Sequence, residues 1–159
     1  MSIAKTVKSY LAQHQVSFDV VSHRHSDSSL SSARQAHIPP GRLAKAVLLE
    51  DERERKHFIM AVVPASRSVE LGRLAQEIGR PLQLASEKDA ASLFADCEAG
   101  AIPPLGPAYG VETVVDDSLM EEPELYFEAG DHQHLVHLAT RELFWLLSDC
   151  KHGEFSQPA

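Results

Sequence analysis

Several kinds of segment are absent from this sequence of 159 residues. No apolar stretch comes near the roughly 18 residues that a membrane-spanning helix needs, so we expect no membrane partner. Residues 1–5 lead into an amphipathic segment instead of a continuous apolar one, and we expect no signal peptide. The length fits one domain with its own core, which we place at 1–151, followed by a flexible tail over 152–159.

Cysteine is scarce. The chain has only two cysteines, Cys97 and Cys150, far apart and in no CxxC motif. A disulfide framework needs more pairs at closer spacing, so reduced thiols are the simpler interpretation. Reduced thiols are typical of a cytoplasmic protein, and that is the location we expect.

The motifs of several enzyme classes are also missing. The sequence has no HExxH and no Cys/His ligand spacing, no GxxxxGK[ST] and no GxSxG. These absences argue against a zinc peptidase, a phosphate-loop nucleotide hydrolase and a serine hydrolase. We expect no cofactor and no metal.

Basic residues are rare in the second half of the chain. Residues 1–80 hold 12 Lys or Arg and 8 Asp or Glu, whereas residues 81–159 hold 3 and 15, and the net charge is −8. The net charge argues against a general nucleic-acid binder, and we expect no DNA partner. A local basic surface in the first half remains able to meet phosphates, although acidity that only maintains solubility is an equal alternative.

Helical and strand patterns alternate along the chain. The periodicity of apolar residues predicts helices over 3–14, 29–37, 69–78, 87–95 and 141–148. It predicts strands over 16–21, 43–50, 57–63, 82–84, 111–115, 125–129 and 135–138. Since the connections at 51–56 and 130–133 are too short for parallel crossovers, we expect an α+β fold with a mixed, mostly antiparallel sheet.

Lys45 lies in an apolar run, Leu43 to Glu50, that reads as a core strand. A lysine in such a strand must snorkel, find an anionic partner or line a cavity. An edge-strand lysine that faces solvent and guards against aggregation is the alternative.

The segment from Cys97 to Gly106 is dense in glycine and proline, with Gly100, Ala101, Ile102, Pro103 and Pro104 at its centre. Glycine allows a ligand close to the backbone, and proline fixes the shape of a loop. Such a loop can present backbone amides to a small polar group, although an ordinary connection has the same composition.

Histidines form a further group. The alternation of His132 and His134 places both side chains on one face if 132–138 is all strand. Together with His23 and His25 they could in principle bind zinc, which leaves a metal-dependent hydrolase open as an alternative. Solvent-facing or structural histidines are the simpler interpretation.

The order of these features matters more than any one of them. Lys45 in its strand precedes Ala61-Val62-Val63-Pro64-Ala65-Ser66-Arg67, then Gly100-x-x-x-Pro104-Leu105-Gly106, then Tyr126-Phe127-Glu128-Ala129-Gly130 leading into His132. This succession, over roughly residues 3–148, resembles the YbaK/ProX family, which includes the editing domain of bacterial prolyl-tRNA synthetases.

The resemblance implies a mixed sheet curled towards a barrel and flanked by helices. It implies a trans-editing deacylase that hydrolyses the ester of mischarged tRNA, with alanine, serine or cysteine on tRNA for proline as the expected substrate. It assigns the functional lysine to Lys45 and the substrate-binding loop to Gly100 through Pro104, with His132 or His134 at the pocket. The implied partners are the acceptor end of tRNA and an aminoacyl-tRNA synthetase.

Two positions depart from the family pattern. Pro103 stands where many relatives have Ser or Thr, and the segment around Asp131 is rich in histidine. Both neighbour the expected pocket and leave the substrate side chain open. A module that binds aminoacyl-tRNA or a synthetase without hydrolysing anything is the main alternative to an enzyme.

Overall fold

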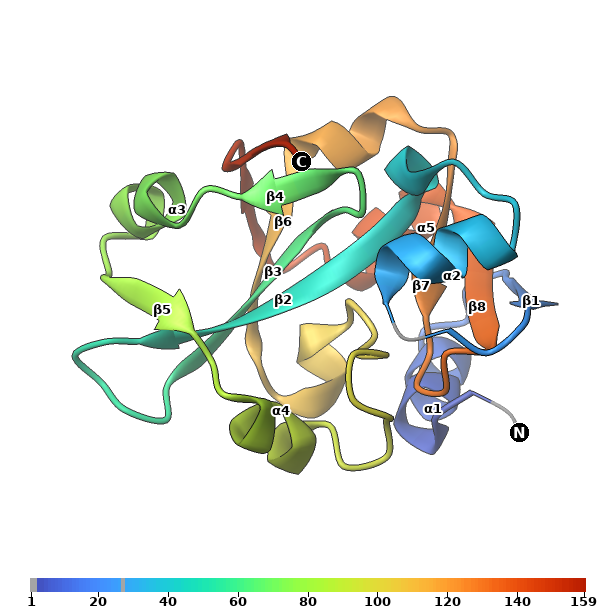
Figure 1. Cartoon of the computed structure of the whole chain (residues 1–159), viewed down its shortest axis with the longest axis horizontal. Helices are drawn as coiled ribbons and strands as arrows, with labels where there is room; N and C mark the ends of the chain where they lie inside the picture. Colours follow the sequence, from blue (N-terminus) through green and yellow to red (C-terminus); the bar gives the residue numbers. More distant parts are fainter. Residues whose placement is uncertain (1–2, 27) are drawn as a thin grey trace.

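A long mixed sheet organises the chain in a computed structural model that describes residues 3–26 and 28–159 (Figure 1). The strands of this sheet, in spatial order, are β1 (Asp19–Ser22), β8 (His134–Ala139), β7 (Glu124–Glu128), β2 (Leu43–Asp51), β3 (Phe58–Pro64), β6 (Glu112–Asp116) and β9 (Lys151–Gly153). β5 (Leu82–Leu84) pairs with the end of β2. A separate two-stranded sheet joins β4 (Arg67–Val69) to β10 (Ser156–Pro158).

The sheet is mixed, as the sequence predicts. β2 runs antiparallel to β3 and β5 and parallel to β7, while β6 runs parallel to both β3 and β9. The α+β prediction is therefore confirmed. The barrel-like closure is not: within the part of the chain that the structure describes, β1 and β9 form the two ends of the sheet and do not pair.

Helices cover both faces of the sheet. They are α1 (Lys5–Gln13), α2 (Ser29–Gln35), α3 (Leu71–Ile78), α4 (Glu87–Leu93) and α5 (Thr140–Leu146), with short 3-10 turns at Pro40–Arg42, Gly106–Tyr109 and Asp117–Glu121. α1 and α5 pack on the face that carries Leu48 of β2. α2 packs on Leu43 and α3 on Leu49, both of which lie on the opposite face.

Capping residues set several helix boundaries. The Ser28 hydroxyl accepts a hydrogen bond from the Ser31 amide and begins α2, and Ser86 does the same for Asp89 at α4. Gly79, with φ of +72°, ends α3 in the left-handed conformation that glycine adopts most readily. Asp27, the residue before Ser28, lies outside the described residues.

The alternation of side chains along β2 positions the site. Leu43, Lys45, Val47 and Leu49 share one face of this strand, because successive side chains point to opposite sides. β2 crosses the molecule with α2 beside its beginning and β5 near its end (Figure 1). On this face, Lys45 therefore lies between Leu43, on which α2 packs, and Leu49, on which α3 packs.

The end of the chain differs from the sequence prediction. Residues 152–159 are not a loose tail: they continue β9, form β10, and bury Phe155 completely against Leu74 and Leu49. Across residues 3–26 and 28–159, no helix has the length and apolar character to cross a membrane.

Candidate functional site

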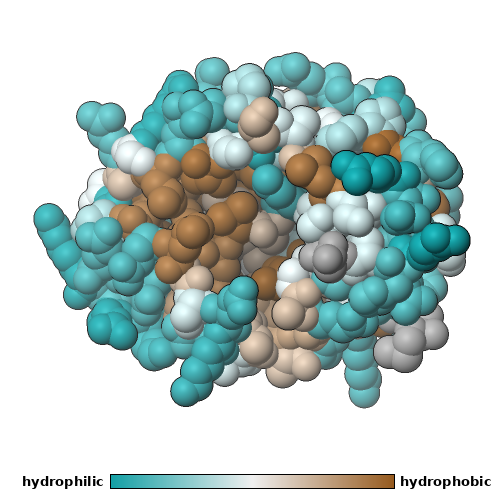
Figure 2. Space-filling model, in the orientation of Figure 1, coloured by the Kyte–Doolittle hydropathy of each residue, from teal (hydrophilic) through white to brown (hydrophobic). Residues whose placement is uncertain are grey.

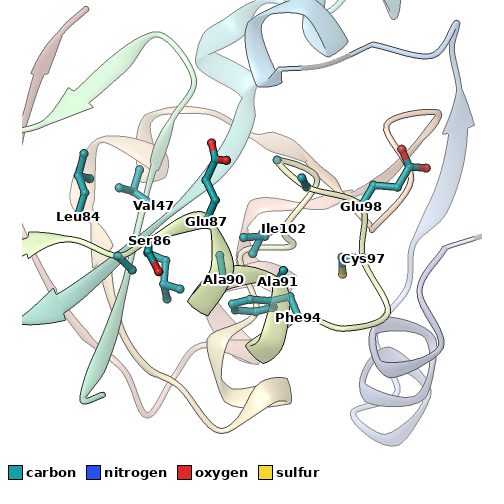
Figure 3. Close-up of a pocket in the computed structure, with 14 residues that line it drawn as sticks. Val47, Leu84, Ser86, Glu87, Ala90, Ala91, Phe94, Cys97, Glu98 and Ile102 are labelled. Carbon is teal, nitrogen blue, oxygen red and sulfur yellow. The ribbon is translucent and has the colours of Figure 1, made fainter. Parts of the chain in front are cut away.

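A cavity of about 280 Å³ opens between β2, β5, α4 and the segment that follows α4. Val47 and Leu84 form one side, Cys97 and Glu98 the other, and the α4 side chains lie between them (Figure 3). In Figure 2 this face of the molecule is hollowed near its centre, with hydrophobic residues gathered to one side of the hollow. The wall is mainly apolar, so the cavity can exclude water from a small bound group.

The lining residues come from four segments of the chain. Val47 and Leu48 belong to β2, while Leu84, Ala85 and Ser86 run from β5 to the start of α4. Further lining residues are Glu87, Ala90, Ala91 and Phe94 at α4, and Cys97, Glu98, Ala99, Gly100 and Ile102 in the loop beyond it. The carboxylates of Glu87 and Glu98 add negative charge to an otherwise apolar site.

Lys45 is two residues before Val47 on β2 and shares its face of the strand. Their Cα atoms are therefore roughly 7 Å apart, although Lys45 itself is not part of the cavity wall. The side chain is half-buried, and burial lowers the pKa of its ammonium group, with no carboxylate among residues 3–26 and 28–159 acting to restore it. A half-buried cation without a counterion is typical of a functional position.

Some residues of the loop over 100–104 line the cavity, and the others are buried in the core. Gly100 and Ile102 line the cavity, whereas Ala101, Pro103 and Pro104 are buried behind it. Gly100 has φ of +80°, a conformation that a residue with a side chain adopts only at a cost. The Ala101 amide donates to the carbonyl of Glu98 at 3.0 Å and closes the turn.

His132 and His134 do not share a strand face, which corrects the sequence prediction. β8 begins only at His134, and His132 lies before it with φ of +57°. His132 is buried, with its imidazole between Glu128 and the carbonyl of Ala99. His134 bonds to the Asp131 carboxylate at 2.6 Å, and neither histidine is among the residues that line the cavity.

Comparison with known proteins identifies the family. The family model described as the aminoacyl-tRNA editing domain matches residues 23–146, which include β2, α4, the Gly100 loop and His132. The chain belongs to the aminoacyl-tRNA editing domain family. The matched segment includes every wall of the cavity, so the cavity is a feature of the editing domain itself.

Solved structures share the fold of this editing domain at low sequence identity. The hypothetical protein APE2540 matches with a TM-score of 0.83 and 17% identity over 96% of this chain and 100% of its own. A protein described as a candidate trans-editing enzyme for prolyl-tRNA synthetase matches with a TM-score of 0.80 and 19% identity over 98% of this chain and 99% of its own. A signal transduction candidate from Marinobacter aquaeolei VT8 matches with a TM-score of 0.77 and 19% identity over 98% of this chain but only 31% of its own.

Cys97 is the one cysteine in the wall of the editing-domain cavity. Burial raises the pKa of its thiol to about 12, and the thiol also contacts Tyr109 and Asp96. At neutral pH the group is therefore a protonated thiol and a poor nucleophile. No cluster of three or more His, Cys, Asp or Glu side chains in residues 3–26 and 28–159 is arranged to hold a metal ion.

Sequence reasoning missed Glu128, a carboxylate that is 2% exposed inside β7. It accepts hydrogen bonds from Ser32 of α2 and contacts His132. The available signal was of the same kind as for Lys45, a single charged residue inside the apolar run Leu125 to Ala129. A charge at such a position must be paired or have a function.

Proposed function

We propose that this editing domain acts in trans as an aminoacyl-tRNA deacylase, hydrolysing the ester between a wrongly attached amino acid and the terminal adenosine of tRNA. The observation that carries the proposal is the half-buried ammonium of Lys45 beside a mainly apolar cavity, with no carboxylate partner in the part of the chain that the structure describes. A fold has no structural need for such a charge, since its desolvation is unfavourable.

Lys45 supplies the positive charge. Ester hydrolysis passes through a tetrahedral intermediate whose carbonyl oxygen becomes negative, and the tRNA end brings a phosphate. An ammonium that is partly shielded from water interacts with either group more strongly than one at the surface. Lys45 is therefore assigned to the reacting carbonyl or the adjacent phosphate.

The Gly100 loop holds the aminoacyl group. Without a Cβ, Gly100 leaves room for a substrate to approach the backbone closely. Gly100 and Ile102 would contact the substrate directly, and Ala101, Pro103 and Pro104 would keep the loop in shape from the buried side. His132 acts on the loop through its contact with the carbonyl of Ala99, the residue before Gly100. His134 is a second proposed substrate-binding histidine, outside the cavity wall.

The nucleophile is water, oriented by a ribose hydroxyl of the substrate. Cys97 is protonated at neutral pH and so does not compete for this role. Positioning together with charge stabilisation can lower the barrier without a protein nucleophile. With cysteinyl-tRNA, the thiol of the substrate itself could attack the ester.

The substrate we propose is alanine, serine or cysteine on tRNA for proline. The mainly apolar wall favours small, uncharged side chains, and a larger correct amino acid would be rejected on size. The structural likeness to a candidate trans-editing enzyme for prolyl-tRNA synthetase supports the choice of tRNA. It also supports association with a synthetase that would deliver the acceptor end.

The test is a panel of tRNAs for proline charged with alanine, serine, cysteine or proline. We expect release of at least one of the first three, at a rate about tenfold or more above that of proline. Binding of these tRNAs without any release above spontaneous hydrolysis would replace the enzyme by a binding module. Preferential release of proline would contradict the proposed specificity.

A further inference from the structure

A buried polar network contacts the segment that leads into the Gly100 loop, and its side chains are not among those that line the cavity. Glu128 and His132 are 2% and 3% exposed. The Ser32 hydroxyl donates to Oε2 of Glu128 at 2.9 Å, and Nδ1 of His132 contacts the same oxygen at 2.9 Å. Ser26 bonds to Ser32 at 2.5 Å and extends the network below α2.

The network ends on the loop. Nε2 of His132 lies 2.7 Å from the carbonyl oxygen of Ala99, the residue before Gly100. The amide of Glu98 donates to the carbonyl of Gly130 at 2.7 Å, which joins the same two segments a second time. Both bonds connect the cavity wall to the turn between β7 and β8, so a shift in that turn would move the wall.

The hydrogen-bonding pattern limits where protons can lie. A carbonyl oxygen only accepts, so Nε2 of His132 carries a hydrogen. The contact between Nδ1 and Glu128 holds one further proton, on the imidazole or on the carboxyl. Burial raises the pKa of the Glu128 carboxyl, against the opposite effect of the Ser32 and His132 hydrogen bonds. The 2.9 Å separation of Nδ1 and Oε2 therefore joins the two side chains through one hydrogen bond, whichever of them carries the proton.

The fold maintains this arrangement at a cost. His132 adopts φ of +57°, which is unfavourable for a residue with a side chain. Oε1 of Glu128 and Nε2 of His23 are both buried without a hydrogen-bond partner among the described residues, 4.0 Å apart. Strain and unpaired polar groups of this kind collect at functional sites, where the surrounding structure holds them for a purpose.

We propose that Glu128 and His132 are positioning residues, which hold the Ala99 carbonyl and with it the Gly100 loop in the geometry that ester hydrolysis requires. This inference rests on the proposed function for its kinetic consequence. It differs from direct substrate binding by His132, because the imidazole reaches the cavity only through the backbone of the loop.

The kinetic test compares His132→Ala, Glu128→Ala and Glu128→Gln with the wild-type chain on the best mischarged tRNA. A loop displaced by about 1 Å lowers turnover by about 100-fold, so kcat should fall in both alanine variants while KM stays within about threefold. Glu128→Gln keeps a group that can bond to the imidazole and should restore most of kcat. The double alanine variant should be no slower than either single variant, because both act on one chain of contacts.

Hydrogen exchange supplies a readout that does not need activity. The Ala101 amide, which closes the loop turn, should exchange faster in His132→Ala, while amides of β3 keep their wild-type rates. His152→Ala is the matched control: this exposed histidine bonds to Asp117, far along the chain from the loop, and its replacement should change neither measurement.

The outcomes separate the two proposals. If the wild-type chain releases no amino acid from any tRNA, the proposed function fails, and exchange at Ala101 alone decides whether the pair holds the loop. If the wild type is active but His132→Ala keeps its kcat, or raises KM alone, the positioning role is overturned. Unchanged exchange at Ala101 would overturn it as well.

Discussion

Lys45 illustrates what a local pattern can and cannot decide. The sequence leaves two interpretations open, a lysine at a sheet edge and a lysine beside a cavity. In the structure β2 pairs with β3 along its length and with β7 only at Leu43 and Ala44, and Lys45 is half-buried instead of fully facing solvent. Neighbouring strands are set by pairing between distant segments, and the pattern around one residue does not contain that information.

Replacing Lys45 by methionine should stabilise the fold while removing activity. Burial lowers the pKa of Lys45 in the folded protein, so the charged form is less favourable there than in the unfolded chain. We expect Lys45→Met to raise the free energy of unfolding at pH 7 by at most about 1 kcal/mol.

The sign of this effect sets its pH dependence. Burial of the charged Lys45 ammonium lowers the free energy of unfolding by its full amount when the pH is below the pKa that Lys45 has in the folded protein. This destabilisation disappears as the pH rises towards the pKa of about 10.4 that lysine has in the unfolded chain. Urea unfolding at pH 7 and above pH 10 checks this. A variant that is less stable than wild type at pH 7 would show that Lys45 has a stabilising partner.

Gly100 can be compared with a second glycine of the same conformation. Gly100 and Gly79 have φ of +80° and +72°, and a Cβ added at Gly79 meets nothing within 4 Å. An alanine at either position should cost about 1 to 2 kcal/mol of stability. Only Gly100→Ala should also lower amino-acid release, because only that glycine lines the cavity. Equal activity of the two variants, measured at matched stability, would remove the loop from the site.

The histidines show where residue-level prediction stops. A strand over 132–138 would place His132 and His134 side by side, but the left-handed conformation of His132 turns its side chain inward, onto Glu128. Alternation says nothing about a single residue that leaves the strand conformation. The sequence could mark the segment as unusual but could not predict which histidine is buried.

At the scale of elements, the sequence predicts more than it does for single residues. Hydrophobic periodicity and caps place α2, α4 and the β2–β3 hairpin within a few residues of their observed bounds. Three short strands are the exception. β4, β9 and β10 have three residues each, and the sequence pattern does not predict them, although it predicts the equally short β5. β4 and β10 pair with each other where the buried Phe155 brings the end of the chain back to the fold.

The β1–β8–β7 ribbon should be more stable at acidic pH because of His137. Its ring stacks on Tyr126 and bonds to Asp19 and Glu124. Partial burial by itself would lower the pKa of His137, but the hydrogen bonds to Glu124 and Asp19 outweigh it and raise the pKa. The stabilisation is therefore complete below the unfolded value of about 6.5 and is lost as the pH rises through the raised pKa.

His137→Gln measures this contribution. Since Asp19 is 71% exposed, solvent limits the effect, and we expect a loss of up to about 1 kcal/mol at pH 5.5 that vanishes above pH 8. Thermal unfolding across this range checks the prediction, with His152→Gln as the exposed control. A loss that does not vary with pH would mean that packing, and not charge, explains the role of His137.

For the whole molecule, the site joins two halves of opposite charge. Lys45 comes from the half with a balance of basic residues, and the Gly100 loop from the acidic half. Spacing along the chain could not predict that Val47, two residues after Lys45 on β2, lines the same cavity as Gly100. The resemblance to a family supplied the expectation that Lys45 and this loop act together. Among the arginines of the basic first half, Arg42 bonds to Glu122 and Glu124, and Arg67 to Ser156. We propose that the exposed Arg24 and Arg34 contact the acceptor end of tRNA, whose binding should then weaken as salt rises.

Single-turnover release of the amino acid from mischarged tRNA, by wild-type protein and by folded Lys45→Met, tests the central claim most directly. Loss of a group that stabilises developing charge lowers the rate of such reactions by about 100-fold or more. The account predicts rapid release by the wild type and a loss of that size in the variant. Equal rates in the two proteins would contradict it, because the reaction would then proceed without the charge beside the cavity.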